Sequence, residues 1–165
     1  MKKFLILACS ALFFATSCLS GDNNPGESSA KYVGTITTTD LSTGEKKVIE
    51  GAVIRVTFPN ISESKMNIVF YDMKFGTMMP KVDIEVENIP FLVTQVPEEA
   101  SLNFNFDVKN VVPKSGGISY ESFMMSRLWG DIGRVVKITF VVPSREMEVF
   151  FTTETKTNTE TTSEN

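Results

Sequence analysis

The chain has 165 residues, of which 42% are hydrophobic, so it is long enough for one domain with a substantial core. Its 16 basic and 20 acidic residues give a formal charge of -4, which offers no electrostatic footprint for nucleic acid. Histidine is absent, which removes the commonest metal ligand and excludes a classical serine-histidine triad. We therefore expect a non-enzymatic protein with no catalytic residues, no metal site and no cofactor.

The N-terminus has the pattern of a secretory signal peptide. Two lysines precede an apolar run, Phe4 to Ala15, which is too short to span a bilayer as a helix. Small residues and then Cys18 end this run, an order that resembles the lipobox of bacterial lipoproteins. The resemblance implies that residues 1–17 are removed and that Cys18 is acylated, which anchors the protein to a membrane. The alternative is an ordinary signal peptide that is cleaved near Ser17.

The residues after Cys18 predict where the anchor lies and how the domain is stabilised. No aspartate follows Cys18 directly, which resembles sorting to the outer membrane, facing either the periplasm or the cell surface. Residues 18–31 contain the Gly, Asn, Pro and Ser that are typical of a flexible tether. If Cys9 is removed and Cys18 carries lipid, the folded domain has no disulfide and depends on packing.

Residues 32–154 have the character of successive short strands. Strands are predicted at 32–39, 47–58, 66–73, 80–89, 102–111, 118–128, 134–142 and 145–153. A turn is predicted at 129–133. The clearest of them alternates Phe104 and Phe106 with Asn105 and Asp107, which predicts one apolar and one polar face. The apolar piece 91–96 either continues the fourth strand or begins the next hairpin. A helix over 120–129 is the alternative to the sixth strand.

Eight antiparallel strands without helical crossovers predict an all-β domain, which is either a barrel or a sandwich. We favour an antiparallel meander barrel with little or no helix, because closure removes the unpaired edges of so apolar a sheet. Residues 155–165, which are rich in Thr and Glu, are expected to be a disordered tail.

Three segments of the chain resemble one family. The stretch from Met78 to Val86, preceded by Tyr71 to Phe75, resembles the middle of the calycin-like, or lipocalin-like, barrel lipoproteins of Gram-negative gut and oral anaerobes. The segments Tyr32 to Ile36 and Val136 to Phe140 fit the same pattern. The Gly-x-Trp signature of true lipocalins is missing. The resemblance implies a meander barrel and no established ligand.

Two apolar groups that lie beside predicted turns are candidates for a ligand-binding rim. They comprise Phe75, Met78 and Met79 in one loop and Phe123, Met124 and Trp129 near another. Methionine and aromatic side chains adapt to varied apolar surfaces, and ligands enter small barrels at the mouth. Packing of these residues in the core is the favoured alternative.

Two sets of charged residues could also form sites. Asp83, Glu85 and Glu87 on one strand face could bind calcium or act as acid and base, but a solvated face is favoured because the opposite face is apolar. Asp72 and Lys74 are interpreted as a surface ion pair.

We therefore expect a non-enzymatic outer-membrane lipoprotein whose lipocalin-like barrel binds a small apolar ligand. The alternative is a structural module, or one that binds a protein or glycan at the cell surface, with a filled barrel and no cavity for a small molecule. The volume of the cavity distinguishes the two. The expected partners are the membrane, through the lipid anchor, and one of these ligands, but not nucleic acid.

Overall fold

A computed structural model describes residues 28–74, 80–96 and 101–153. These residues form eleven strands and three single 3-10 turns. The elements are β1 (Ser28–Asp40), β2 (Lys46–Asn60), η2 (Ile61–Glu63), β3 (Lys65–Met73), β4 (Val82–Pro90), β5 (Leu92–Val96), β6 (Ser101–Val111), β7 (Lys114–Ser115), β8 (Ile118–Ser119), η3 (Glu121–Phe123), β9 (Met125–Ile132), β10 (Val136–Val142), η4 (Pro143–Arg145) and β11 (Met147–Thr152). Within this part of the chain no helix has the length and hydropathy to cross a membrane.

All eleven strands belong to one antiparallel sheet that curls strongly into a half-barrel. Its order is β5-β6-β9-β10-β11-β1-β2-β3-β4-β7-β8, so strands that are adjacent in the chain are mostly adjacent in the sheet. The prediction of an all-β, antiparallel domain is therefore confirmed. The prediction of a closed eight-stranded barrel is wrong, because the sheet begins at β5 and ends at β8, and these two strands do not pair.

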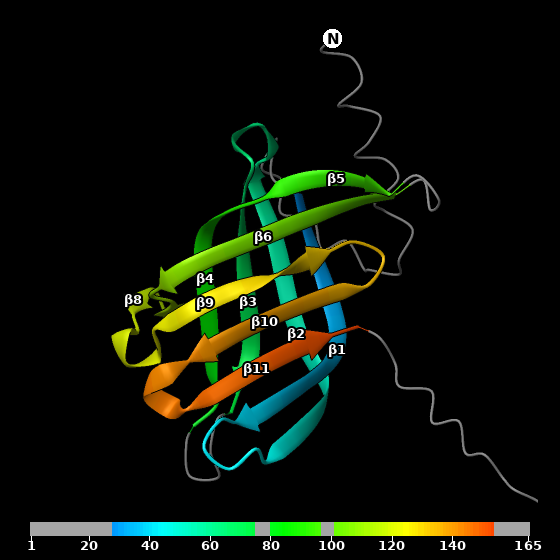
Figure 1. The fold of residues 1–165 in the computed structure, drawn as a ribbon. Helices are drawn as coiled ribbons and strands as arrows, with labels where there is room; N and C mark the ends of the chain where they lie inside the picture. Colours follow the sequence, from blue (N-terminus) through cyan, green and yellow to red (C-terminus); the bar gives the residue numbers. More distant parts are fainter. Residues whose placement is uncertain (1–27, 75–79, 97–100, 154–165) are drawn as a thin grey trace, which may run out of the picture.

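Two groups of strands cross each other in Figure 1, and the core lies between them. One group contains β2, β3 and β4, and the other contains β6, β9, β10 and β11. Strand β1 joins the two groups. Its residues 28–34 pair with β2 alone, whereas residues 35–39 pair with both β2 and β11. The change occurs at a bulge between Gly34 and Thr35, and bulges of this kind bend a strand at a barrel corner.

A second corner lies between β4 and β5. Pro90 ends β4, and the amide of Phe91 donates a hydrogen bond to the carbonyl oxygen of Ser64, at 3.0 Å. The chain then enters β5, which pairs with β6 in the other group. Residues 92–96 thus form a strand at the edge of the sheet. The corner carries the chain across the opening of the half-barrel but does not close it by strand pairing.

The connection between β6 and β9 differs from its prediction. Residues 118–128 were expected to form one strand and residues 129–133 a turn, but both expectations are wrong. The chain forms the short strands β7 and β8, then η3, and only then β9, which continues through Trp129 to Ile132. The 3-10 turn η3 breaks the extended backbone here and places Phe123 in the core, where it is completely buried and contacts Phe140. A helix over 120–129 is also absent, since only Glu121–Phe123 form a helical turn.

The apolar faces of the strands meet in a core that is rich in phenylalanine. Phe58, Phe91 and Phe104 form one cluster, with ring centroids 5.0 to 5.5 Å apart. Phe140 contacts Phe70 at 5.3 Å and Phe123 at 6.2 Å in a second cluster. The predicted alternation of β6 is confirmed, because Phe104 and Phe106 are 6% and 5% exposed while Asp107 lies at the surface. No polar or charged side chain of the described residues is buried.

Candidate functional site

The outer face of β6 and β9 carries a tryptophan that is covered by an ion pair. Trp129 lies opposite Asp107 on the neighbouring strand, and Arg127 is two residues away on the same face of β9. The Arg127 guanidinium lies over the indole ring, 4.6 Å from its centroid. The same guanidinium donates two hydrogen bonds to Asp107, from Nε at 2.9 Å and from Nη2 at 2.8 Å. A cation is therefore held in fixed geometry above the only tryptophan of the chain.

The ion pair shifts the pKa of both partners. The hydrogen bond from Arg127 lowers the pKa of the Asp107 carboxyl, and the positive charges of Arg127 and Lys109 act in the same direction. The hydrogen bond to Asp107 likewise raises the pKa of Arg127. Both side chains are about half exposed, at 48% and 47%, so water screens the attraction. The pair thus orients the guanidinium more than it stabilises the fold.

A row of uncharged side chains extends from Trp129 across four further strands. In register order it runs Trp129, Thr139, Phe150, Thr37 and Val48. Trp129 and Phe150 are two strands apart, which is about 10 Å at the usual spacing of strands in a sheet. We call these five residues the outer row. Two aromatic rings with a hydroxyl between them can stack against a ligand and hydrogen-bond to it.

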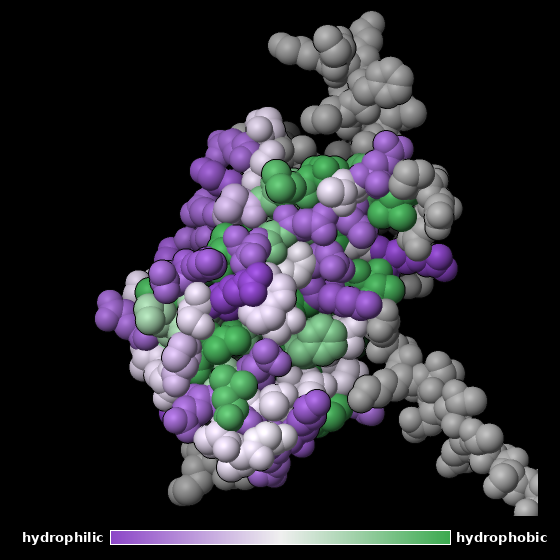
Figure 2. All heavy atoms as spheres, viewed as in Figure 1, coloured by the Kyte–Doolittle hydropathy of each residue, from purple (hydrophilic) through white to green (hydrophobic). Residues whose placement is uncertain are grey.

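Charged and apolar groups are interspersed on this face of the molecule. Figure 2 shows hydrophilic and hydrophobic atoms mixed over β6, β9, β10 and β11, without one continuous hydrophobic area. The row beside the outer row contains Arg127, Val141, Glu148, Thr39 and Lys46, so charges of both signs border the rings. A mixed surface of this kind suits a polar or amphipathic partner better than a purely apolar one.

The residues predicted to form an apolar rim are not brought together in the part of the chain that the structure describes. Phe123 is completely buried inside the half-barrel, whereas Trp129 lies on its outer face. Met124, between them in the chain, is 41% exposed. Phe75, Met78 and Met79 lie outside the described residues, as does the predicted lipidation site Cys18. The proposed contact between the two apolar groups stays a prediction.

Two of the three carboxylates of β4 accept hydrogen bonds from neighbouring parts of the sheet. Glu87 accepts a hydrogen bond from the ammonium of Lys114 at 2.6 Å, which raises the pKa of that lysine. Asp83 accepts a hydrogen bond from the backbone amide of Asp72, at 2.9 Å. Among the described residues no three His, Cys, Asp or Glu side chains converge as metal ligands would. The interpretation of this face as a solvated strand surface fits its exposure.

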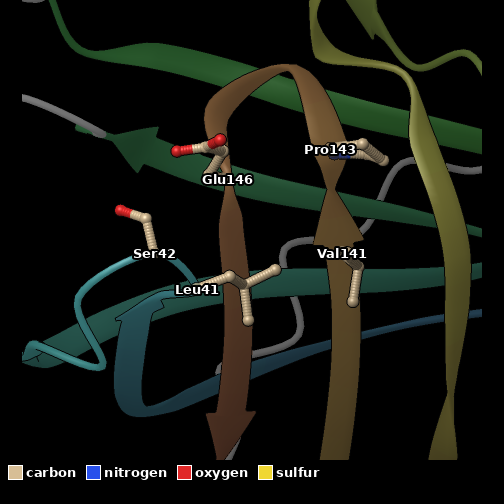
Figure 3. A pocket seen from close by; sticks show the side chains of 5 residues that line it. All are labelled: Leu41, Ser42, Val141, Pro143 and Glu146. Atoms are coloured by element: carbon tan, nitrogen blue, oxygen red, sulfur yellow. The ribbon is translucent and has the colours of Figure 1, made fainter.

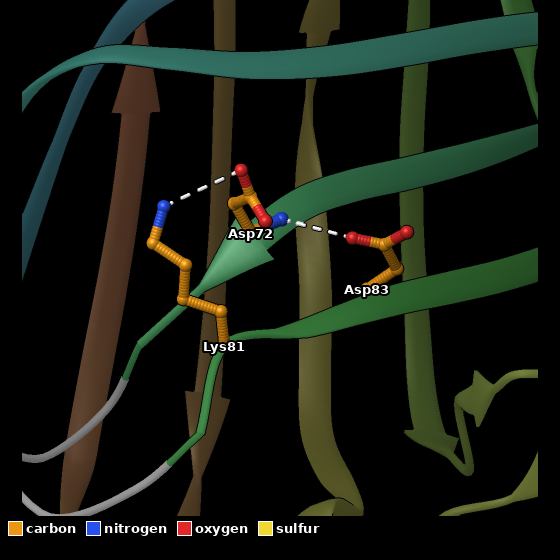
Figure 4. A network of polar contacts seen from close by, with 3 residues as sticks. All are labelled: Asp72, Lys81 and Asp83. Atoms are coloured by element: carbon orange, nitrogen blue, oxygen red, sulfur yellow. Dashed lines mark hydrogen bonds and ion pairs between the residues drawn. The ribbon is translucent and has the colours of Figure 1, made fainter.

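Figure 4 shows that Asp72 pairs with a different lysine from the one predicted. Its carboxylate lies 3.4 Å from the ammonium of Lys81, on the other side of the β3–β4 connection. The backbone of Asp72 has a positive φ of 53°, which bends the end of β3 and directs its amide toward Asp83. The predicted pair of Asp72 with Lys74 is thus wrong, although an exposed ion pair does form there.

A shallow hollow lies beside the turn between β10 and β11 (Figure 3). It has a volume of about 220 Å³ and is lined by Leu41, Ser42, Val141, Pro143 and Glu146. The carbonyl oxygen of Glu146 already accepts a hydrogen bond from the amide of Leu41, at 2.6 Å. Because most of its lining is exposed, the hollow does not enclose a ligand.

The Asp107–Arg127–Trp129 contact is not predicted from the sequence, because the sequence pattern places Trp129 in a turn. The alternation of Arg127, Trp129 and Asp131 with Leu128, Gly130 and Ile132 was the available signal. It predicts a strand with the first three residues on its polar face. The pairing of that face with Asp107 depends on the register of β6 with β9, which is a tertiary property.

Comparisons with known proteins do not assign the chain to a family. No family model matches its sequence, and neither the curated proteins nor the solved structures include a match.

Proposed function

We propose that this protein is a non-enzymatic, lipid-anchored interaction domain, which binds a protein or glycan with its outer surface. The observation that supports this proposal is the contact between aromatic rings in the core of the half-barrel. Phe58, Phe91 and Phe104 pack against one another at one position along the core. At a second position Phe140 contacts both Phe70 and Phe123. Phe140 pairs with Leu128 of β9, which lies four residues before Ile132, the partner of Phe104. Rings that contact each other leave no room between them for a small molecule.

The outer row is the surface that best suits such a partner. Trp129 and Phe150 offer aromatic area, and Thr37 and Thr139 supply hydroxyl groups beside them. Aromatic and arginine side chains are the residues that most often contribute to binding energy at protein surfaces. Arg127, which lies on Trp129, adds a donor that is already oriented by Asp107.

The sequence supports the remaining parts of the proposal. The absence of histidine leaves few routes to acid-base or nucleophilic catalysis, which supports a binding role. The signal peptide pattern and Cys18 support attachment to the outer membrane by lipid. The resemblance of the strand pattern to calycin-like lipoproteins agrees with the same location, since that family is anchored in this way.

Capture of a small apolar ligand, as in lipocalins, is the competing function. It has less support, because Phe123 of the proposed rim contributes to the core instead of to an exposed mouth. Its other residues, Phe75, Met78 and Met79, lie outside the described part of the chain.

Native mass spectrometry of the protein purified from its own cells tests the proposal. We expect the mass of the polypeptide with its lipid and no further small molecule. A stoichiometric apolar compound that remains bound would contradict the proposal that the interior has no room for a ligand. It would favour the capture of a small apolar ligand.

The fluorescence of Trp129 tests the surface, because it is the only tryptophan and reports on the outer row alone. We expect soluble glycans or partner proteins to shift its emission, and the variant Phe150→Ala to weaken that response. The matched control is Val33→Ala, an exposed apolar residue outside the row. A saturable blue shift with fatty acid, and none with any polar partner, contradicts the proposal.

A further inference from the structure

We propose that β5 joins two copies of this chain, by antiparallel pairing of β5 with β5 of the second copy into one continuous sheet. This inference is independent of what the outer row binds. Strand β5 is the first in the sheet order and pairs only with β6 among the described strands. In Figure 1 it borders the group that contains β6, β9, β10 and β11.

The edge of β5 requires an extended backbone as its partner. A strand with one neighbour leaves every second N–H and C=O group pointing away from the sheet, and another strand satisfies these groups best. The side chains of β5 do not block its approach. Leu92 is 75% exposed and Val93 is 52% exposed, and they lie on opposite faces of the strand. Both faces of an added strand would therefore find apolar contact.

Charge distinguishes β5 from the first parts of β1 and β2, which are also incompletely paired. The first part of β2 pairs only with β1, and it carries Lys46, Lys47 and Glu50. The first part of β1 pairs only with β2, and it carries Lys31. At the far end of the sheet β8 has only two residues. Charges and short length are the usual means by which proteins protect an edge, and the five residues of β5 have neither a charge nor a proline.

The uncharged composition of β5 favours a second copy of the chain as the partner of this edge. Leu92, Val93, Thr94, Gln95 and Val96 are all uncharged. Antiparallel pairing of β5 with itself therefore opposes no like charges in any register, although each chain has a net charge of -4. Such pairing is isologous, so every contact occurs twice and the assembly closes as a dimer without extending into a fibre.

Sedimentation equilibrium of the full chain in a density-matched nonionic detergent tests the proposal. We expect a reversible dimer whose dissociation constant rises about tenfold or more in Val93→Lys, because a charge is then placed twice at the interface. The matched control is Val33→Lys, since Val33 is 62% exposed, lies outside the outer row and belongs to a strand that already carries charges. This variant should change the dissociation constant by less than about twofold.

Hydrogen exchange on the unmodified chain gives a second measurement that needs no variant to fold. We expect the amides of Leu92–Val96 to exchange more slowly as the protein concentration rises, while those of residues 28–34 do not change. A chain that is monomeric at every concentration, or a dimer that Val93→Lys does not weaken, overturns the proposal. Protection of β5 only when a membrane extract is added also overturns it and assigns the edge to another protein.

Discussion

At the scale of single residues, Phe123 and Met124 are neighbours in the chain with opposite environments. Phe123 is completely buried, stacks on Tyr120 at 5.8 Å and contacts Phe140, whereas Met124 is 41% exposed. We expect Phe123→Ala to lower the free energy of unfolding by about 3–5 kcal/mol, because it leaves a cavity in the core. Met124→Ala should cost about half a kcal/mol or less. Urea titrations measure both, and equal small losses would place Phe123 at the surface.

The hydrogen bonds of Asp40 in the turn between β1 and β2 are expected to depend on pH. Its carboxylate accepts hydrogen bonds from the hydroxyl of Ser42 at 2.6 Å and from the amide of Thr43 at 2.9 Å. The hydrogen bond from the Ser42 side chain is the largest cause that lowers the pKa of Asp40 from 3.8 to about 2. A lowered pKa means that the carboxylate supports the turn above about pH 4, and that this support is lost as the pH falls through about 2.

The chemical shifts of the Ser42 and Thr43 amides should therefore titrate with a midpoint of about 2. In Asp40→Asn the same amides should show no such step, because the amide side chain can still accept a hydrogen bond but does not ionise. A midpoint at the ordinary value of 3.8 would mean that the turn does not hold the carboxylate as described.

At the scale of elements, Gly34 allows β1 to bend from one group of strands to the other. A Cβ atom built on this residue would overlap the carbonyl oxygen of Thr152 on β11. We expect Gly34→Ala to destabilise the protein by about 1–3 kcal/mol, because β1 and β11 would have to move apart. The midpoint of urea unfolding measures this loss.

The control for this bend is Gly44, which lies in the turn between β1 and β2. It has a φ of +73° and nothing within 4 Å of the position of a Cβ atom. Asparagine tolerates this backbone conformation, so Gly44→Asn should change the stability by about half a kcal/mol or less. Loss of similar size in both variants would mean that the corner at Gly34 tolerates a side chain.

At the scale of the whole molecule, stability comes from packing without covalent links in the described part of the chain. Both cysteines, Cys9 and Cys18, precede residue 28, so no disulfide can form within the strands. We expect a reducing agent to leave the melting temperature of the full chain unchanged. A fall in the melting temperature would show that a disulfide through Cys9 or Cys18 contributes to stability.

Cysteine variants of the full chain test the proposed lipid anchor. The variant Cys18→Ala should lose metabolic incorporation of a fatty acid and should no longer fractionate with the outer membrane, because Cys18 is the proposed acylation site. The control is Cys9→Ala, which should remain lipidated. Fatty acid that is still incorporated into Cys18→Ala would contradict the proposed anchor.

Local pattern was sufficient to predict most of the strands but none of the corners. The alternation in β4 and β6 predicts which side chains lie inside, and Ile84, Val86, Phe104 and Phe106 are buried as expected. The alternation is a property of each strand alone, so no knowledge of its neighbours is needed. The interruption at Phe123 was not predictable in this way, because it depends on the space that Phe140 and Tyr120 leave in the core.

By itself, the sequence determined the strand content, the inner and outer faces of the clearest strands, and the absence of histidine chemistry. Closure was decided only by the tertiary structure, since every strand can pair on both sides and the same alternation suits a barrel, a sandwich or an open sheet. The outer row was likewise decided by the tertiary structure and not by local sequence pattern. Trp129 and Phe150 are 21 residues apart in the chain, and only the registers of β9 with β10 and of β10 with β11 place them in one row.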